Sequence, residues 1–262
     1  MMRALYSAAT GMIAQQYNID TISNNLANVN TTGFRENEAR FQDLIYQNMR
    51  APGTPVGPSV VPVGQDVGLG VKVSASEKTF TQGVLQQTQN PLDVAIEGDG
   101  FFQVTLPDGT TAYTRDGSFK RDANGSIVTA DGYFLNPQIT IPQNATAVQV
   151  GTDGTVSAQI PGQQTPQTLG QMQLVRFTNA AGLSPKGQNL FQQTGASGAP
   201  TISQPGLNGA GTLQGGYLEQ SNVSVVQEMV NLITAQRAYE ANSKSITTAD
   251  SMLSTAVQMK QG

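Results

Sequence analysis

The C-terminal stretch Ser224 to Lys260 contains neither proline nor glycine, which favours one continuous helix. Ser224 followed by Gln227 is typical of a helix start, because both side chains can bond free backbone N–H groups. A 3-4 spacing of mostly apolar residues then predicts a coiled-coil seam. Its apolar members are Val225, Leu232, Ala235, Tyr239, Ile246, Ala249, Leu253 and Ala256. A helix this long spans roughly 55 Å at about 1.5 Å per residue, so we expect it to have a partner.

Residues 1–30 offer that partner, because their apolar residues follow the same spacing. The members of this N-terminal seam are Leu5, Ala8, Met12, Ile19, Ile22, Leu26 and Val29. Only Arg3 and Asp20 are charged in this stretch, whereas a solvated helix face usually carries more charge. We therefore expect the two ends of the chain to lie side by side as a coiled coil that becomes ordered on assembly. Two amphipathic helices packed in an ordinary core remain the alternative.

The composition excludes several classes of site. The chain of 262 residues contains no Cys, His or Trp, which excludes disulfides, thiol or imidazole catalysis and the usual zinc ligands. A net charge of −4 gives no electrostatic basis for binding nucleic acid. No apolar run approaches the ~20 residues of a membrane span, and residues 1–16 lack the apolar stretch of a signal peptide. Export without a cleaved signal peptide is therefore expected, with no insertion into a membrane.

The middle of the chain predicts antiparallel β-structure. Four dipeptides suited to tight turns recur about every eight residues: Asp108-Gly109, Asp116-Gly117, Asn124-Gly125 and Asp131-Gly132. Short segments with alternating apolar residues lie between and after them, which indicates a compact β domain over residues 93–199. Residues 178–216 are poor in apolar side chains and predict a mainly extended return to the base of the β domain.

The stretch before this domain is less regular. Residues 35–50 carry a mixed set of charges, and either a prolonged helix or an extended arm fits them. Four prolines then exclude a regular helix and a central strand between residues 51 and 63: Pro52, Pro55, Pro58 and Pro62. Such proline density favours semi-rigid extended chain.

Three motifs resemble the axial proteins of the bacterial flagellum, the family of rod, hook and hook-associated proteins. The N-terminal axial motif comprises Ser23, Asn24, Asn25, Leu26, Ala27 and Asn28, followed by Gly33 and Phe34. The other two are Leu92 to Phe102 with Tyr113 to Gly117, and Glu228 to Glu240. The opening residues Met1 to Met12 are most similar to the distal rod proteins of the basal body. The likeness covers essentially the whole chain.

The resemblance implies a structural subunit that self-assembles into a straight, hollow, helical shaft. That shaft carries torque from the motor to the hook through the peptidoglycan and outer-membrane rings, spanning the periplasm. The implied partners are copies of itself, proximal rod proteins, the hook protein, the ring proteins and a rod cap during assembly. The resemblance also implies that residues 47–63 are a rod-type insertion associated with a stiff shaft.

No catalytic or cofactor-binding constellation emerges from the sequence. Asp122 to Ser126 starts like a calcium loop, but its glycine comes too early and Tyr133 stands where glutamate is required. Glu97 and Asp99 form a carboxylate pair beside Phe101 and Phe102, and a turn between glycines explains them better than glycoside hydrolysis does. We expect no enzyme activity, no catalytic residues, no cofactor and no metal.

The sequence as a whole predicts an α+β protein with terminal helices in a coiled coil and extended connecting segments around a central antiparallel β-rich domain. We expect a helical domain at 1–34 and 221–262, a connecting domain at 35–92 and 200–220, and the β domain at 93–199. One alternative function is another axial protein, either a proximal rod or a hook subunit. A second is a β-rich adhesin or glycan-acting enzyme that uses Glu97 and Asp99, although the absence of Trp weakens sugar stacking.

Overall fold

The computed structural model describes residues 2–53, 55–56, 59–60 and 62–261. The chain forms two compact units. The first, here called the helical unit, contains the chain up to Ala27, residues Asn37–Glu77 and the chain from Ser224 onward. The second, the β unit, contains Asn28–Glu36 and Lys78–Val223. The boundaries of these two units differ from those of the three domains expected from the sequence. The expected domain boundaries stay a prediction.

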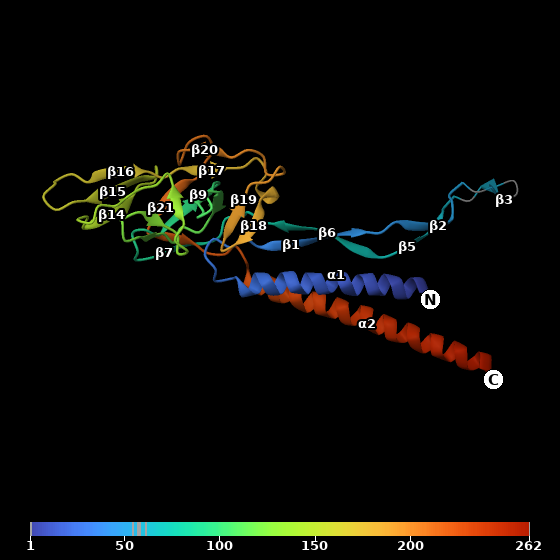
Figure 1. The fold of residues 1–262 in the computed structure, drawn as a ribbon. Coiled ribbons are helices and arrows are strands. Elements are labelled where there is room, and N and C mark those ends of the chain that lie inside the picture. The colour runs from blue at the N-terminus through green and yellow to red at the C-terminus, as the bar shows by residue number, and fades with distance from the viewer. Residues whose placement is uncertain (1, 54, 57–58, 61, 262) are drawn as a thin grey trace. The chain divides into compact units, whose positions relative to one another are not determined.

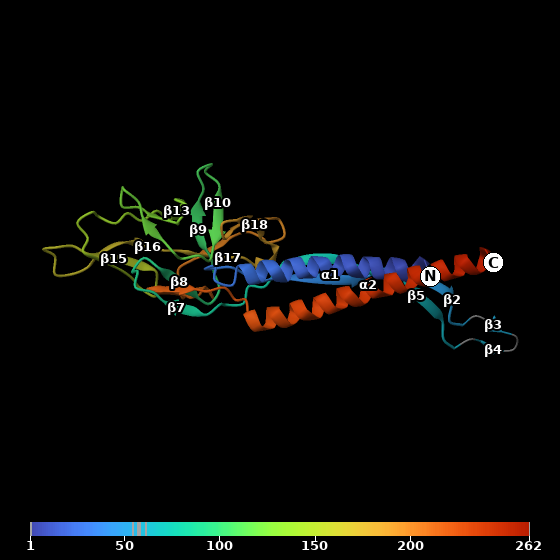
Figure 2. The same ribbon diagram turned by 90° about the horizontal axis from the view of Figure 1, so that it is seen from below.

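Two helices dominate the helical unit. Helix α1 spans Met2–Ala27 and helix α2 spans Val225–Gln261, so both predicted helices are confirmed. Helix α2 begins directly after Ser224, as the capping pattern predicts. The helices lie side by side with opposite chain directions (Figure 1) and remain side by side in the perpendicular view (Figure 2). Because α2 has 37 residues and α1 has 26, the C-terminal end of α2 continues past the start of α1.

The rest of the helical unit is a two-stranded ribbon rather than a prolonged helix. Strand β1 (Asn37–Asp43) pairs with β6 (Val71–Lys78), and β2 (Tyr46–Arg50) pairs with β5 (Gln65–Gly68). Further along the ribbon β3 (Pro55–Val56) pairs with β4 (Ser59–Val60). Helix α1 contacts β1, whereas every residue of β2 is exposed. The extended arm is therefore the correct alternative for residues 35–50.

The β unit consists of short antiparallel strands, which confirms the predicted β-rich centre. Its largest sheet has seven strands in the order β11-β12-β13-β9-β10-β19-β18, and a three-stranded sheet has the order β14-β15-β16. Three further pairs are β17-β20, β21-β8 and β22-β7. The strands are β7 Leu85–Gln87, β8 Val94–Glu97, β9 Phe102–Thr105, β10 Thr111–Thr114, β11 Lys120–Arg121, β12 Ile127–Val128, β13 Phe134–Asn136, β14 Ala147–Val150, β15 Thr155–Gln159, β16 Gln167–Gln171, β17 Leu174–Arg176, β18 Ser184–Gly187, β19 Leu190–Gln192, β20 Thr201–Ser203, β21 Thr212–Gly215 and β22 Tyr217–Glu219.

Glycines shape the turns between these strands. Gly109, Gly125 and Gly132 adopt positive φ angles of 79°, 88° and 86°, as the turn dipeptides predict. Gly117 serves another purpose, because a Cβ atom there would collide with the carbonyl oxygen of Val94. In three of the four predicted turns glycine is therefore favoured because of its positive φ angle. At the fourth, Gly117, glycine is required because two chain segments approach closely there.

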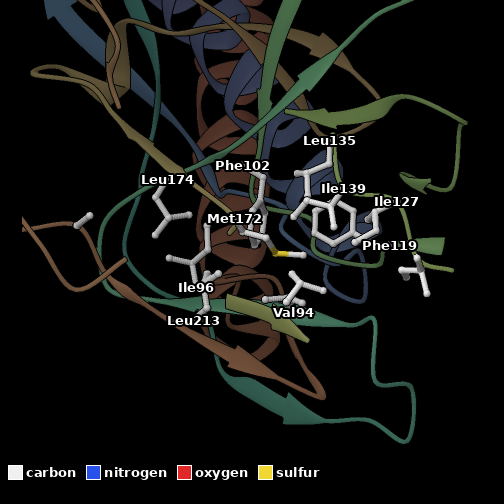
Figure 3. Packing of buried hydrophobic residues seen from close by; sticks show 13 residues of the cluster. Val94, Ile96, Phe102, Phe119, Ile127, Leu135, Ile139, Met172, Leu174 and Leu213 are labelled. Atoms are coloured by element: carbon white, nitrogen blue, oxygen red, sulfur yellow. The ribbon is translucent and has the colours of Figure 1, made fainter. Parts of the chain in front are cut away.

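The β unit has a closed apolar core. Figure 3 shows side chains from strands far apart in the sequence converging on Phe102 and Met172, among them Val94, Ile96, Leu135, Leu174 and Leu213. A second cluster contains Phe101, Tyr113, Val175, Leu183 and Phe191, and within it the rings of Phe101 and Phe191 meet edge to face. No helix in the described part of the chain is long and apolar enough to cross a membrane.

The prediction for residues 178–216 is wrong in one respect. This segment is not mainly an extended return, because it contributes strands β18 to β21 and a short 3-10 helix, Ala180–Gly182. Strand β19 pairs with β10 in the largest sheet, and β21 pairs with β8 at the core. Ile202 and Leu207 of this segment are each 55% exposed, whereas Phe191 and Leu213 are almost fully buried. Their placement, rather than their number, decides the structure of this part.

Candidate assembly interface

The contact between α1 and α2 is built from small residues. Ala8 and Ala14 of α1 and Ala235 and Ala249 of α2 are all buried. Gly11 lies so close to α2 that a Cβ atom there would stand 2.9 Å from the side-chain amide of Asn242. Small side chains allow two helix backbones to approach closely, but they bury little apolar area per residue. The pair therefore fits together well and gains limited hydrophobic stabilisation.

A buried polar cluster fixes how the two helices meet. The Asn25 amide donates to the Glu228 carboxylate (3.1 Å) and to the Asn37 carbonyl (2.9 Å), and its oxygen accepts the Asn37 backbone N–H (2.9 Å). Glu228 also accepts from the Asn231 amide at 3.0 Å. Asn25 and Glu228 are 1% and 2% exposed. Asn25 thus ties α1 to α2 and to the start of β1, which gives the axial motif a structural role.

The predicted N-terminal seam is only partly enclosed. Ala8 and Ile22 are buried, and Leu5, Met12, Ile19 and Leu26 are partly buried. The prediction that Val29 belongs to the helical seam is wrong, because α1 ends at Ala27 and Val29 lies in the turn that follows. The Asn-rich sequence explains this early end, since asparagine side chains compete for backbone groups. Asn25 bonds the Asn37 backbone, and the Asn28 side chain accepts from Thr31.

The C-terminal seam shows the same partial burial. Ala235 and Ala249 are buried, Leu232, Ile246 and Leu253 are partly buried, and Val225, Tyr239 and Ala256 are exposed. Heptad packing of the two helices as a coiled coil, and the role of both seams in assembly, stay predictions.

The end of the axial motif belongs to the β unit. Gly33 has a φ of 67° and its N–H donates to the Glu219 carbonyl at 2.9 Å. A side chain at Gly33 would collide with the backbone at Arg115 and Asp116. Glycine is therefore required both for its positive φ angle and for this close approach. Gly33 thus serves a close approach within the β unit and does not end α1, whose last residue is Ala27. The Lys78 ammonium lies over the Phe34 ring at 5.1 Å. The remaining motif residues, Ser23, Asn24, Ala27 and Asn28, lie at or near the surface.

One buried carboxylate joins three distant segments of the β unit. Glu219 accepts from Arg35 (2.7 Å), Arg115 (3.2 Å) and the Gly83 backbone N–H (2.9 Å). All three charged side chains are at most 4% exposed. Burial lowers the pKa of Arg115 to about 10, and the nearby Glu219 carboxylate opposes that shift. Sequence reasoning missed this cluster, because isolated charges 184 residues apart form no local pattern.

The prolines of the expected insertion are described only in part. Pro52 and Pro62 are exposed and lie outside strands, and Pro55 begins β3. Pro58 lies outside the described residues. Proline at the start of an edge strand agrees with the expected exclusion from central strands.

The carboxylates considered as a catalytic pair have structural partners. Glu97 accepts from the Gln214 amide at 2.9 Å, and Asp99 is exposed and 3.8 Å from Arg176. Asp122 accepts the Asn124 backbone N–H, as expected for a turn. Among the residues that the structure describes, no group of three or more His, Cys, Asp or Glu side chains could hold a metal ion.

Large apolar side chains on the outer faces of both helices are exposed. On α1 they are Met2, Tyr6, Ile13 and Tyr17, and on α2 they include Val226, Met229, Val230 and Ile233. Several of these side chains are more than half exposed, for example Met2 at 80% and Val226 at 75%. Both helices therefore carry large apolar side chains that the chain itself leaves exposed.

Known sequence families cover most of the chain in three segments. Residues 5–35 match the family "Flagella basal body rod protein", and residues 95–158 match the "Flagellar hook protein FlgE/F/G D1 domain". Residues 214–259 match the family "Flagellar basal body rod FlgEFG protein C-terminal". The first and last segments contain the α1 motif and the α2 contact residues described above.

Individual relatives match over the full length. A flagellar basal-body rod protein FlgG from Borreliella burgdorferi is 51% identical over 264 residues, covering 100% of both chains. The protein of that name from Bacillus subtilis is 39% identical over 267 residues, again covering 100% of both. A flagellar hook protein FlgE from Helicobacter mustelae is 47% identical over 139 residues, which is 52% of this chain and 30% of that protein. The chain belongs to the family of flagellar basal-body rod proteins, the structural subunits of the flagellar rod.

Proposed function

We propose that this chain builds the distal rod, as a subunit of a straight, hollow, helical shaft whose inner layers are formed by α1 and α2. The observation that carries the proposal is the apolar surface on the outer faces of both helices, which the chain itself does not cover. Burying one Leu- or Ile-sized side chain stabilises by roughly 1.5–3 kcal/mol, so several such residues per copy suffice to drive polymerisation. The full-length match to relatives named as rod proteins, against a half-length match to a hook protein, favours the rod.

The free end of α2 supports an open polymer rather than a closed dimer. Met252, Val257 and Met259 lie near the end that extends past α1, and they are 50%, 57% and 74% exposed. Different faces of the same chain thus offer apolar surface at different heights along the helices. A contact between unlike faces generates a filament when its rotation does not close.

The rod position implies further partners and a location. Neighbours at the two ends would be proximal rod proteins and the hook protein, with a rod cap present during assembly. Residues facing outward would turn inside the peptidoglycan and outer-membrane rings as the shaft spans the periplasm, and the subunit would be exported without a cleaved signal peptide. The uncharged polar residues of the helices suit a channel that passes unfolded export substrates without holding them.

Polymerisation tests the proposal. Full-length protein at increasing concentration should form straight filaments in electron micrographs, with a sharp threshold concentration. The matched control is a chain of residues 28–223 in which a short linker replaces Asn37–Glu77, so that both helices and the ribbon are absent. This chain should stay monomeric under the same conditions. Full-length protein that stays monomeric at high concentration would contradict the proposal.

The ribbon tip offers a second test. Residues 47–63 include most of the exposed strand β2 and the prolines, and we expect this insertion to brace neighbouring copies and keep the shaft straight. Deleting residues 47–63 should leave polymerisation intact but give curved, hook-like filaments. Straight filaments from the deletion variant would show that stiffness arises elsewhere.

A further inference from the structure

The outer face of α1 forms a narrow apolar stripe, here called the α1 stripe. Its members Met2, Tyr6, Ile13 and Tyr17 are 80%, 57%, 67% and 37% exposed. At about 100° per residue they fall within a sector of roughly 60°. This sector is opposite the face that contains Gly11 and contacts α2. The α1 stripe therefore points away from α2.

The outer face of α2 carries a shorter stripe, here called the α2 stripe. Its members Val226, Met229, Val230 and Ile233 are 75%, 52%, 54% and 52% exposed. Their spacing of three and four residues places them on one side of the helix. The same side then becomes charged, because it continues through the exposed residues Arg237, Glu240 and Lys244.

The two stripes lie at different heights along the helix pair. Asn25 bonds Glu228, and Gly11 lies against Asn242, so facing residues have numbers that add to about 253. The α2 stripe is thus level with the last two turns of α1, beyond the end of the α1 stripe at Tyr17. Since the stripes also face opposite directions, they cannot cover each other within one chain.

We propose that the α1 stripe of one copy docks onto the α2 stripe of the next copy, with the two copies staggered by ~15 Å along the helices. This inference rests on the proposed polymerisation and names the contact that produces it. Copies with the same polarity present these two helices to each other in antiparallel directions, as a repeating filament requires. The α1 stripe of one copy then faces residues 226–241 of its neighbour.

Charge complementarity selects both the occupant and the register. If Ile13 of one copy faces Val230 of the next, the two residue numbers add to 243. Tyr17 then faces Val226, because their numbers have the same sum. The same register sets Arg3 beside Glu240 and Tyr6 beside Arg237, which gives an ion pair and a cation–π contact where the α2 stripe becomes charged. The shift from 253 to 243 equals ten residues, or ~15 Å at 1.5 Å per residue. A second copy of this chain therefore fits the α1 stripe in both apolar and charged positions.

Cysteine cross-linking tests this register directly, because the natural chain contains no Cys. The double variant I13C/V230C, assembled and then oxidised, should give a ladder of covalent multimers on a denaturing gel. The matched control I13C/K244C places the second cysteine on the same side of α2 but 14 residues away, or ~21 Å, and should give no ladder. Each single variant should give no ladder.

The outcomes separate this inference from polymerisation itself. Filaments with a ladder from I13C/K244C, or with no ladder from I13C/V230C, would overturn the proposed register while the filament account stands. Absence of filaments from the natural protein would overturn both. A ladder that forms only after another protein is added would overturn the second copy as the occupant.

Charge reversal gives an independent readout. Arg3→Glu and Glu240→Arg, each alone, should raise the concentration needed for assembly several-fold, and the double variant should restore it. Arg3 also contacts the Met49 sulfur within its own chain at 3.4 Å, and that contact alone cannot explain a rescue by Glu240→Arg. A double variant as poor as the single variants would overturn the Arg3–Glu240 contact.

Discussion

The two units of this chain bury their apolar residues to very different extents. In the β unit Val94, Ile96, Phe102, Phe119 and Leu213 have no exposed surface at all. In the helical unit the fully buried apolar residues of the two helices are mostly alanines, Ile22 is the large one among them, and many other large apolar residues are exposed. The β unit thus has the core of an independent domain, whereas the helical unit resembles half of an interface.

The units also use buried polar groups differently. Glu219 forms ion pairs with Arg35 and Arg115 inside the β unit, and it joins segments that already pack together. Asn25 and Glu228 provide a small number of directional bonds between helices that have little else to fix their register. The β unit therefore gains stability from its core, while polar contacts set the register of the two helices, and we propose that neighbouring copies stabilise the helical unit.

The largest expected effect is in the β unit. Glu219→Gln leaves two buried arginines without their shared anion, which should destabilise this unit by about 3–5 kcal/mol. Denaturant unfolding followed by a signal from the β unit measures this. The matched control is Glu97→Gln, which changes an exposed carboxylate of the same unit. Equal midpoints for the two variants would contradict the importance of the buried cluster.

A smaller effect is expected at the α1–α2 contact. Asn25→Ala removes the partner of Glu228 and of the Asn37 backbone, at a cost of about 1–3 kcal/mol, and a better helix propensity offsets roughly 0.5 kcal/mol. Hydrogen exchange should accelerate in α1 and stay unchanged in the β unit. Ser23→Ala, an exposed change in the same helix, should not accelerate it. Equal exchange in both variants would show that Asn25 does not hold α1.

The smallest effect on stability is expected at the outer stripes. Val226→Ser should change monomer stability by no more than about 0.5 kcal/mol, because the side chain is 75% exposed. It should nevertheless raise the threshold concentration for filaments. Ile202→Ser in the β unit, where the side chain is 55% exposed, is the control and should change neither quantity. Light scattering against concentration gives both thresholds, and equal thresholds would remove the α2 stripe from the assembly interface.

Local patterns predicted the elements whose formation depends on local physics. The 3-4 spacing and the absence of proline and glycine predicted α2, and positive-φ glycines such as Gly125 followed from Asn-Gly and Asp-Gly dipeptides. The ends of elements were harder, because Val29 continues the apolar spacing although the asparagines around it have already ended α1. The helix spacing placed Ala8, Ala235 and Ala249 in the seams, but it could not show how close Gly11 lies to α2.

Long-range contacts could not be predicted from local patterns. Arg35, Arg115 and Glu219 are single charges in segments that meet only in the folded β unit. Strands β18 to β21 were missed because residues 178–216 are rich in Gly, Ser, Gln and Pro, and pairing with β10 and β8 supplies what the composition lacks. Asn25 was recognised as part of a motif, but its bond to a carboxylate 203 residues away required the structure.

Hydrogen exchange of the full-length protein before and after polymerisation tests the central claim most directly. In dilute monomer, the amides of α1 and α2 should exchange much faster than those of β8 and β9, and in filaments they should become as well protected. If both helices are already as protected as the β core in the monomer, and neither changes at high concentration, neighbouring copies are not what holds them in place.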